Sequence, residues 1–276
     1  MRRQDRDAAL ADVEAALATA GRERGAFLQL RGGILAATGE PARGLVDLDA
    51  ALEMGHETAA VRLDRSMALL SLGRHEEARE DAERGVALDP RHAQLRVHRA
   101  HLRMRQGRYA EAVEDAALAV ALDPTVDRAH ANLGLSLSRL RRDPEALAAL
   151  DEAAAREPDM DAIFMERGLV RARLGDHAGA EADLDHVLEV GRGFAEAYHQ
   201  RGVLRARRDD LPGALADYTA FLALHPDHPP VLHRRGLVHE RLGDVEAARA
   251  DWRRALALLD PGDRLAAELR SRLAGR

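Results

Sequence analysis

The chain has 276 residues, of which 46% are hydrophobic and 32% charged, and it contains no cysteine. The lack of cysteine excludes disulfides, thiolate metal sites and cysteine nucleophiles, and because all 41 basic residues are arginine, Schiff-base chemistry on lysine is excluded as well. The net charge of −6 argues against nucleic-acid binding over the whole surface. No apolar run approaches the roughly 18 residues of a membrane span, and no signal peptide begins the chain, so we expect a soluble, cytoplasmic protein.

Residues 1–24 are predicted to form one helix, with Leu10, Val13 and Leu17 on its apolar face. A strict period of 34 residues begins at Gly25. It predicts seven units without insertion or deletion, at 25–58, 59–92, 93–126, 127–160, 161–194, 195–228 and 229–262. Residues 263–276 are predicted to be a C-terminal capping helix, with Asp263 as its N-cap.

Three positions of the period indicate two antiparallel helices in each unit. Position 20 is always glycine or alanine. Position 15 is glycine in five units, as suits the left-handed residue that follows a helix. Position 32 is proline in four units, where it ends the second helix. The fourth unit has Arg141 at position 15, and the fifth has Gly191–Gly193 where proline is expected. These departures are interpreted either as local bends or as drift.

Positions 8 and 24 are predicted to face each other, because their sizes compensate. Position 24 is large wherever position 8 is glycine, and it shrinks to alanine where position 8 has a side chain. The large pairs are Gly32/Leu48, Gly134/Leu150, Gly168/Leu184, Gly202/Tyr218 and Gly236/Trp252, and the small ones are Ser66/Ala82 and Ala100/Ala116.

Positions 7 and 23 are predicted to form a partly buried ion pair within a unit. Arginine and aspartate occupy them in six units, at Arg31/Asp47, Arg65/Asp81, Arg99/Asp115, Arg167/Asp183, Arg201/Asp217 and Arg235/Asp251. The fourth unit loses both partners together, as Leu133 and Ala149. Loss of both is tolerable where loss of one leaves an unpaired buried charge. A wide separation of Arg167 and Asp183 would contradict this pairing.

These features resemble the tetratricopeptide repeat family. The closest local matches are Gly107–Ala112 and Ala119–Pro124, and the resemblance covers residues 25–262. It implies an all-α fold, a right-handed α-solenoid superhelix of helical hairpins with an N-terminal half-unit and the C-terminal cap. It also implies that the first helices line a concave groove and that the protein is a non-enzymatic scaffold for a peptide or protein partner.

The resemblance places groove residues at positions 2, 5, 9, 12 and 13 of each unit. Position 13 is arginine in five consecutive units: Arg105, Arg139, Arg173, Arg207 and Arg241. This arginine ladder has two interpretations, which are recognition of an acidic or phosphorylated segment and stabilisation of helix C-termini through the helix dipole. Met67, Met104 and Met165 are either groove floor or ordinary packing, and His101 and Asn132 are candidate polar groove residues.

The family's carboxylate clamp is not expected, since lysine is absent and only Asn132 occupies a comparable asparagine site. No cofactor and no metal site is predicted, because no histidine pair has a third ligand at suitable spacing. The leading interpretation is a peptide-binding scaffold. The alternatives are an arginine-ladder reader of an anionic ligand, RNA included, and a sensor module of a larger regulatory system. The oligomeric state, the partner and the pathway stay open.

Overall fold

The computed structural model describes residues 3–189 and 195–275. The chain divides into two compact units, unit 1 up to Arg141 and unit 2 from Arg142, and the division falls inside the fourth predicted repeat. The described residues form sixteen helices and no strand, which confirms the predicted all-α fold. The division into seven repeats stays a prediction. A repeat position, from 1 to 34, identifies equivalent residues in different hairpins. The predicted break at Gly191–Gly193 lies outside the described residues.

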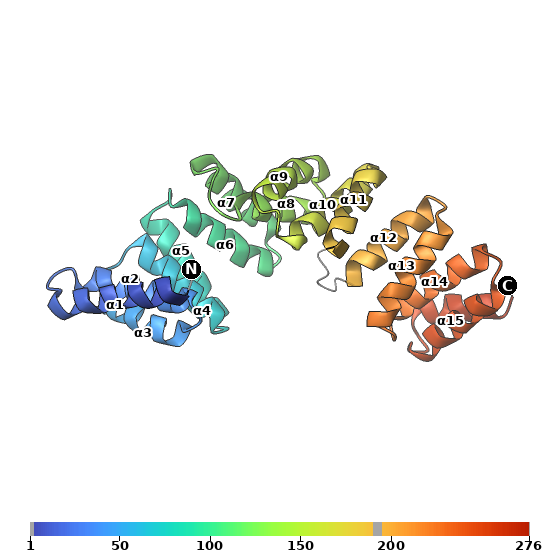
Figure 1. Cartoon of the computed structure of the whole chain (residues 1–276), viewed down its shortest axis with the longest axis horizontal. Helices are drawn as coiled ribbons and strands as arrows, with labels where there is room; N and C mark the ends of the chain where they lie inside the picture. Colours follow the sequence, from blue (N-terminus) through green and yellow to red (C-terminus); the bar gives the residue numbers. More distant parts are fainter. Residues whose placement is uncertain (1–2, 190–194, 276) are drawn as a thin grey trace. The chain divides into compact units, whose positions relative to one another are not determined.

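Each unit is a row of helical hairpins whose neighbouring helices pack together (Figure 1). Unit 1 contains α1 (Arg3–Thr19), α2 (Arg24–Ala37), α3 (Pro41–Glu53), α4 (Ala59–Ser71), α5 (His75–Leu88), α6 (Ala93–Arg105), α7 (Tyr109–Leu122) and α8 (Ala129–Arg139). Unit 2 contains α9 (Asp143–Arg156), α10 (Asp161–Leu174), α11 (His177–Glu189), α12 (Ala195–Arg207), α13 (Leu211–Leu224), α14 (Pro229–Arg241), α15 (Val245–Ala257) and α16 (Arg264–Leu273). No described helix is long and apolar enough to span a membrane.

The turn between the helices of a hairpin has the same backbone conformation whether or not glycine is present. All five glycines at position 15 have positive φ, from 74° at Gly107 to 92° at Gly39. Arg141 (φ 61°) and Asp209 (φ 69°) stand at the same position and also adopt the left-handed conformation. The turn is therefore retained at Arg141, and the two non-glycine residues bear the steric strain of that conformation.

The compensating glycine pairs of unit 2 are in close contact. A Cβ atom added at Gly202 would lie 2.8 Å from the ring of Tyr218, and one added at Gly236 would lie 2.2 Å from Nε1 of Trp252. The contact at Gly168 is looser, with Leu184 Cγ at 3.4 Å. In unit 1, Gly32 meets Leu48 in the same way, with Cγ at 2.8 Å. The Gly134/Leu150 pair has one member in each unit and stays a prediction.

The six predicted ion pairs are all present within their hairpins. The arginine nitrogen and aspartate oxygen lie between 2.5 and 2.7 Å apart in every pair. The test pair Arg167 and Asp183 is at 2.6 Å, so the predicted pairing within a unit is confirmed. The pairs join Arg31 to Asp47, Arg65 to Asp81, Arg99 to Asp115, Arg167 to Asp183, Arg201 to Asp217 and Arg235 to Asp251.

The pairs were predicted to be partly buried. This prediction is correct for the arginine side chains, whereas the aspartates are buried more deeply than predicted. The arginine side chains keep between 14% and 28% of their surface exposed. The six aspartates are buried, from 1% exposed at Asp115 and 2% at Asp217 to 6% at Asp47 and Asp251. The difference arises because the short aspartate lies between the two helices, whereas the arginine stem extends to the surface of the hairpin.

The buried aspartates accept several charge-assisted hydrogen bonds each. Asp115 binds Arg96, Arg99 and Arg103. Asp217 binds Arg201 and Arg205, and Asp251 accepts two hydrogen bonds from Arg235. The burial of these carboxylates is thus compensated by guanidinium donors.

Three of the six position-7 arginines also bind an aspartate of the preceding hairpin, which the comparison of positions 7 and 23 did not predict. Arg65 donates to Asp49 at 2.6 Å, and Arg167 donates to Asp151 at 3.0 Å. Arg201 likewise donates to Asp185 at 2.5 Å. The pairing is therefore both within and between hairpins, because the five N–H groups of arginine can serve two carboxylates at once.

The terminal helices cover the ends of the two cores. Val13 and Leu17 of α1 are buried against Leu28 of α2. Leu269 of α16 is fully buried in a cluster with Trp252, and Asp263 caps α16 by accepting a hydrogen bond from the Leu265 N–H at 3.1 Å. The predicted N-cap at Asp263 is confirmed.

Candidate functional site

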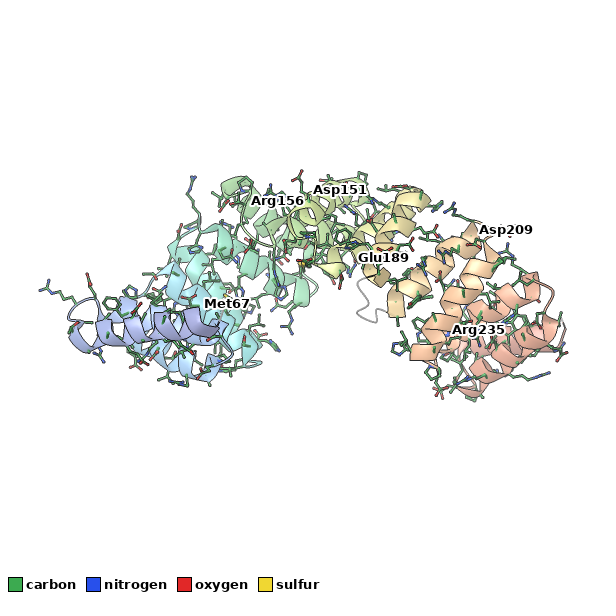
Figure 2. All side chains as sticks on the ribbon, viewed as in Figure 1. Met67, Asp151, Arg156, Glu189, Asp209 and Arg235 are labelled. Carbon is green, nitrogen blue, oxygen red and sulfur yellow. The ribbon has the colours of Figure 1, made fainter. Side chains whose placement is uncertain are left out.

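The unit-1 hollow is a surface depression of about 520 Å³ lined by first helices of the hairpins, α2, α4, α6 and α8, together with the turn before α8. Of the predicted groove residues, Met67, His101 and Asn132 line it. Met67 on α4 is 42% exposed (Figure 2). With Leu70 and Val97 it gives the hollow an apolar floor, a surface suited to peptide side chains.

Polar side chains at position 6 of three successive first helices also face the unit-1 hollow. They are Asp64 on α4, His98 on α6 and Asn132 on α8. The Asn132 amide donates to the Val97 carbonyl oxygen at 3.1 Å, which fixes its orientation. Asn132 was expected at the groove, whereas position 6 as a row was not. The row could have been recognised from the sequence, because a polar residue recurs at this position of the first helix next to buried apolar positions.

The hydrogen bonds around His98 determine its tautomer. The Ser66 hydroxyl donates to the Ala78 carbonyl oxygen at 2.5 Å, so the 2.8 Å contact between Ser66 Oγ and His98 Nε2 requires a proton on Nε2. Nδ1 of His98 is then a hydrogen-bond acceptor. Burial, with a smaller contribution from His101, lowers the pKa of His98 to about 4, so the ring is neutral at pH 7.

Asp64 is a half-buried carboxylate in the unit-1 hollow. Burial raises its pKa above the ordinary value, and a hydrogen bond from Gln29 opposes the shift. Gln29 Nε2 lies 3.3 Å from Asp64 Oδ2, and Gln29 Oε1 lies 3.1 Å from His56 Nε2. Among the described residues, Gln29 is the only hydrogen-bond partner of Asp64, and no arginine pairs with it.

Four other predicted groove residues, Met104, Met165, Arg105 and Arg139, line neither the unit-1 hollow nor the two hollows of unit 2. Met104 is half-buried and packs against the Ala100 cluster, and Met165 is half-buried on α10. Arg105 is exposed at the end of α6. Burial lowers the pKa of His101, and the positive charges of Arg105 and Arg128 lower it further.

Two hollows among the described residues of unit 2 share Val203 and Arg207. The first, of about 230 Å³, is also lined by Arg173 and Gln200. The second, of about 490 Å³, is lined by Arg234 and Arg241 among others. These hollows are therefore lined by apolar side chains and by charged ones of both signs, since Glu240 accompanies the arginines in the second hollow.

The five arginines of the ladder differ in the groups that bind them. Arg173 is bound by Asp143 at 2.7 Å, and Arg241 is bound by Asp209 and by the Ala206 carbonyl oxygen. Within the described part of the chain, Arg105 and Arg207 make no ion pair. Arg139 is exposed at the end of α8.

The turn of the preceding hairpin explains this division. The position-13 arginine reaches back to positions 15 and 17 of that turn, where Asp209 and Asp143 stand. The equivalent positions before Arg207 are Gly175 and His177, which cannot accept a charge-assisted hydrogen bond from it in the same way. Arg207 is consequently exposed on the surface between the two hollows.

In the described residues, 3–189 and 195–275, no group of three or more histidine, aspartate or glutamate side chains is placed to hold a metal ion. His199 and His228 both lie near the Phe221 ring, with centroids at 5.7 and 4.9 Å, but they form a packed aromatic cluster rather than a ligand set.

Comparison with protein families matches the tetratricopeptide repeat model at residues 63–127, 131–193 and 199–273. The chain therefore belongs to the tetratricopeptide repeat family, as the resemblance implied. Repeats of this family are scaffolds for protein interactions. Comparison with curated proteins gave no match.

Solved structures share the all-α repeat solenoid. A chain of the APC/C hetero-tetramer Cut9-Hcn1 matches with a TM-score of 0.66 and 18% identity over 96% of this chain, which spans about half (52%) of the matched chain. YrrB, described as a TPR protein with an unusual peptide-binding site, matches with a TM-score of 0.59 and 19% identity over 69% of this chain and 97% of its own. PilW, a type IV pilus biogenesis factor, matches with a TM-score of 0.66 and 19% identity over 77% of this chain and 98% of its own. At these identities the likeness shows the fold alone.

Proposed function

We propose that the protein is a non-enzymatic interaction scaffold that binds an extended or helical segment of a partner protein in the unit-1 hollow. The observation that carries the proposal is the combination of exposed Met67 with the polar row Asp64, His98 and Asn132 in one depression of about 520 Å³. Apolar floors with a few placed polar groups are typical of peptide sites. YrrB, similar in fold, is described as having a peptide-binding site.

Affinity capture with matched variants tests this function. Met67→Glu places a charge on the floor of the hollow, whereas Val46→Glu changes an equally apolar side chain that is 68% exposed on α3. We expect wild type and Val46→Glu to capture the same partner from the source cells and Met67→Glu to lose it. The captured segment is then synthesised and titrated directly. Equal capture by Met67→Glu would place binding elsewhere and refute the proposal.

A second candidate function rests on Arg207. This exposed arginine lines both unit-2 hollows without an ion pair among the described residues, so it is available to an acidic or phosphorylated segment. If an acidic or phosphorylated peptide binds the wild type and no longer binds Arg207→Gln, this second function is supported. A steep loss of affinity with rising salt for an RNA probe, and not for an acidic peptide, would assign nucleic acid as the ligand. The net charge of −6 favours the peptide.

A further inference from the structure

Asp64 differs from the position-23 aspartates because, among the described residues, no arginine binds it. The position-23 aspartates are each bound by at least one guanidinium, and Asp115 is bound by three. The hydrogen bond that Asp64 accepts from Gln29 is long, at 3.3 Å. A carboxylate that is partly removed from water gains most from a cation that pairs with it.

The surroundings of Asp64 favour a cation rather than an anion. His98 presents Nδ1 as an acceptor, because its Nε2–H is used by Ser66. The pKa values of His98 and His101 are both lowered, so neither ring adds positive charge at pH 7. Of the other described lining residues, Asp127 and Arg128 are charged, one of each sign.

Helix α2 has no side chain next to Asp64 at Gly33. Gly33 lines the hollow, and a Cβ atom at this position would lie 3.1 Å from Asp64 Oδ2. The absence of a side chain at Gly33 therefore leaves room next to the carboxylate. Met67 and Leu70 lie on the same helix as Asp64 and provide an apolar wall for the methylene stem of a long side chain.

We propose that the unit-1 hollow recognises an arginine side chain of the partner segment, with the guanidinium paired to Asp64 and an N–H directed to Nδ1 of His98. The proposal rests on the peptide-binding function proposed above and names the residue type that the site selects. The occupant has the chemistry that the chain itself uses at Asp47, Asp81 and Asp115, a guanidinium on a carboxylate. Guanidinium forks suit such sites through two parallel hydrogen bonds.

Selection from a phage-displayed library of random 12-residue peptides tests the proposal on the full chain. We expect wild type to enrich peptides that share one arginine flanked by apolar residues. Asp64→Asn should lose this arginine preference. Glu114→Gln removes the same charge from an exposed position on α7, outside the hollow, and should keep the preference. The control separates local recognition from attraction to the net charge of the chain.

A synthetic selected peptide then measures the contact. Replacing its arginine by citrulline removes the charge and keeps the shape, and we expect at least about a tenfold loss of affinity for wild type and no loss for Asp64→Asn. Equal affinity of the arginine and citrulline peptides overturns the proposal. Peptides that lack arginine but lose binding with Met67→Glu would overturn it while leaving the proposed function intact. Failure to enrich any peptide that depends on Met67 would overturn both.

Discussion

Arg173 donates hydrogen bonds to both carboxylate oxygens of Asp143, which belongs to the preceding hairpin. The shortest of these contacts is 2.7 Å, and both side chains are largely shielded, at 21% and 14% exposure. Bidentate geometry and partial burial make this pair stronger than an ordinary surface ion pair.

Replacement of Arg173 by Gln should therefore lower the free energy of unfolding of unit 2 by about 1 kcal/mol, whereas Arg207→Gln should leave it unchanged. The measurement is thermal and urea unfolding followed by circular dichroism. The double variant Arg173→Gln/Asp143→Asn should lose less than the sum of the single changes. Additive losses would mean that the two side chains do not interact in solution.

Gly236→Ala should destabilise the protein more than Gly168→Ala. An alanine in a helix is favoured over glycine by about 1 kcal/mol, and the looser contact at Gly168 lets that gain offset the crowding. At Gly236 the added carbon would lie 2.2 Å from Trp252 Nε1. The indole must move, which costs about 1–3 kcal/mol and disturbs its hydrogen bond to the His233 carbonyl oxygen. Comparison of the two unfolding midpoints checks the order, and equal midpoints would contradict it.

Arg141→Gly should stabilise the protein by about 0.5–1 kcal/mol, because glycine adopts the left-handed conformation without steric cost. Asp209→Gly relieves the same strain but also removes the carboxylate that binds Arg241, so its net gain should be smaller. Unfolding midpoints of the two variants provide the measurement. The prediction fails if Asp209→Gly is the more stabilising change.

The low pKa of His98 should make stability depend on pH between 4 and 6.5. The unfolded chain takes up the proton near pH 6.5, whereas the folded ring takes it up near pH 4. Stability contributed by the neutral ring is thus present above pH 6.5 and is lost as the pH falls toward 4, by about 3 kcal/mol in total.

His98→Gln keeps a donor for Ser66 and removes the titration. Between pH 6.5 and 4 the variant should lose about 3 kcal/mol less of its unfolding free energy than wild type, measured by urea unfolding at each pH. Other titrating groups cancel in this comparison. A pKa of His98 near 6.5, observed by NMR, would contradict the prediction.

The fold could be predicted from sequence because local and packing signals repeat together. Gly175 indicated a turn, because glycine adopts the left-handed conformation easily. Gly236 and Trp252 indicated a contact between helices, because the small residue compensates for the volume of the large one. Arg167 and Asp183 were paired because the fourth repeat loses both partners. The turn at Arg141 could not be predicted, since no local preference reveals that neighbouring helices impose a left-handed residue.

The depth at which the position-23 aspartates lie was underestimated for a related reason. Asp217 and Asp251 were expected to be partly buried, as their arginine partners are, yet both are almost fully enclosed. Burial of a carboxylate depends on the donors around it, and Asp217 gains a second arginine, Arg205, from position 11 of the first helix. Comparison of positions 7 and 23 alone does not include that donor.

The candidate site was only partly predictable as well. Met67 and His101 were selected from family groove positions and Asn132 from the family's asparagine site, and all three line the unit-1 hollow. Asp64 and His98 were not selected, because repeat position 6 is not among the groove positions that the family resemblance implies. Their orientation toward the hollow follows from the packing of adjacent hairpins. The partners of the ladder arginines depend on the same spacing between hairpins, which comparison of residues within one repeat does not reveal.

Some position-7 arginines bind two aspartates at once, and this bears on how each unit unfolds. Arg65, Arg167 and Arg201 each join a buried aspartate of their own hairpin to an aspartate of the one before. Detachment of one hairpin breaks only the bond to the aspartate of the preceding hairpin, whose side chain is 42–47% exposed and can be solvated by water, while the buried aspartate keeps its arginine. Each such contact therefore adds only about 0.2–1 kcal/mol to the interface between hairpins. Cooperative unfolding of a unit must therefore come mainly from the apolar packing between neighbouring hairpins, which these ion pairs supplement.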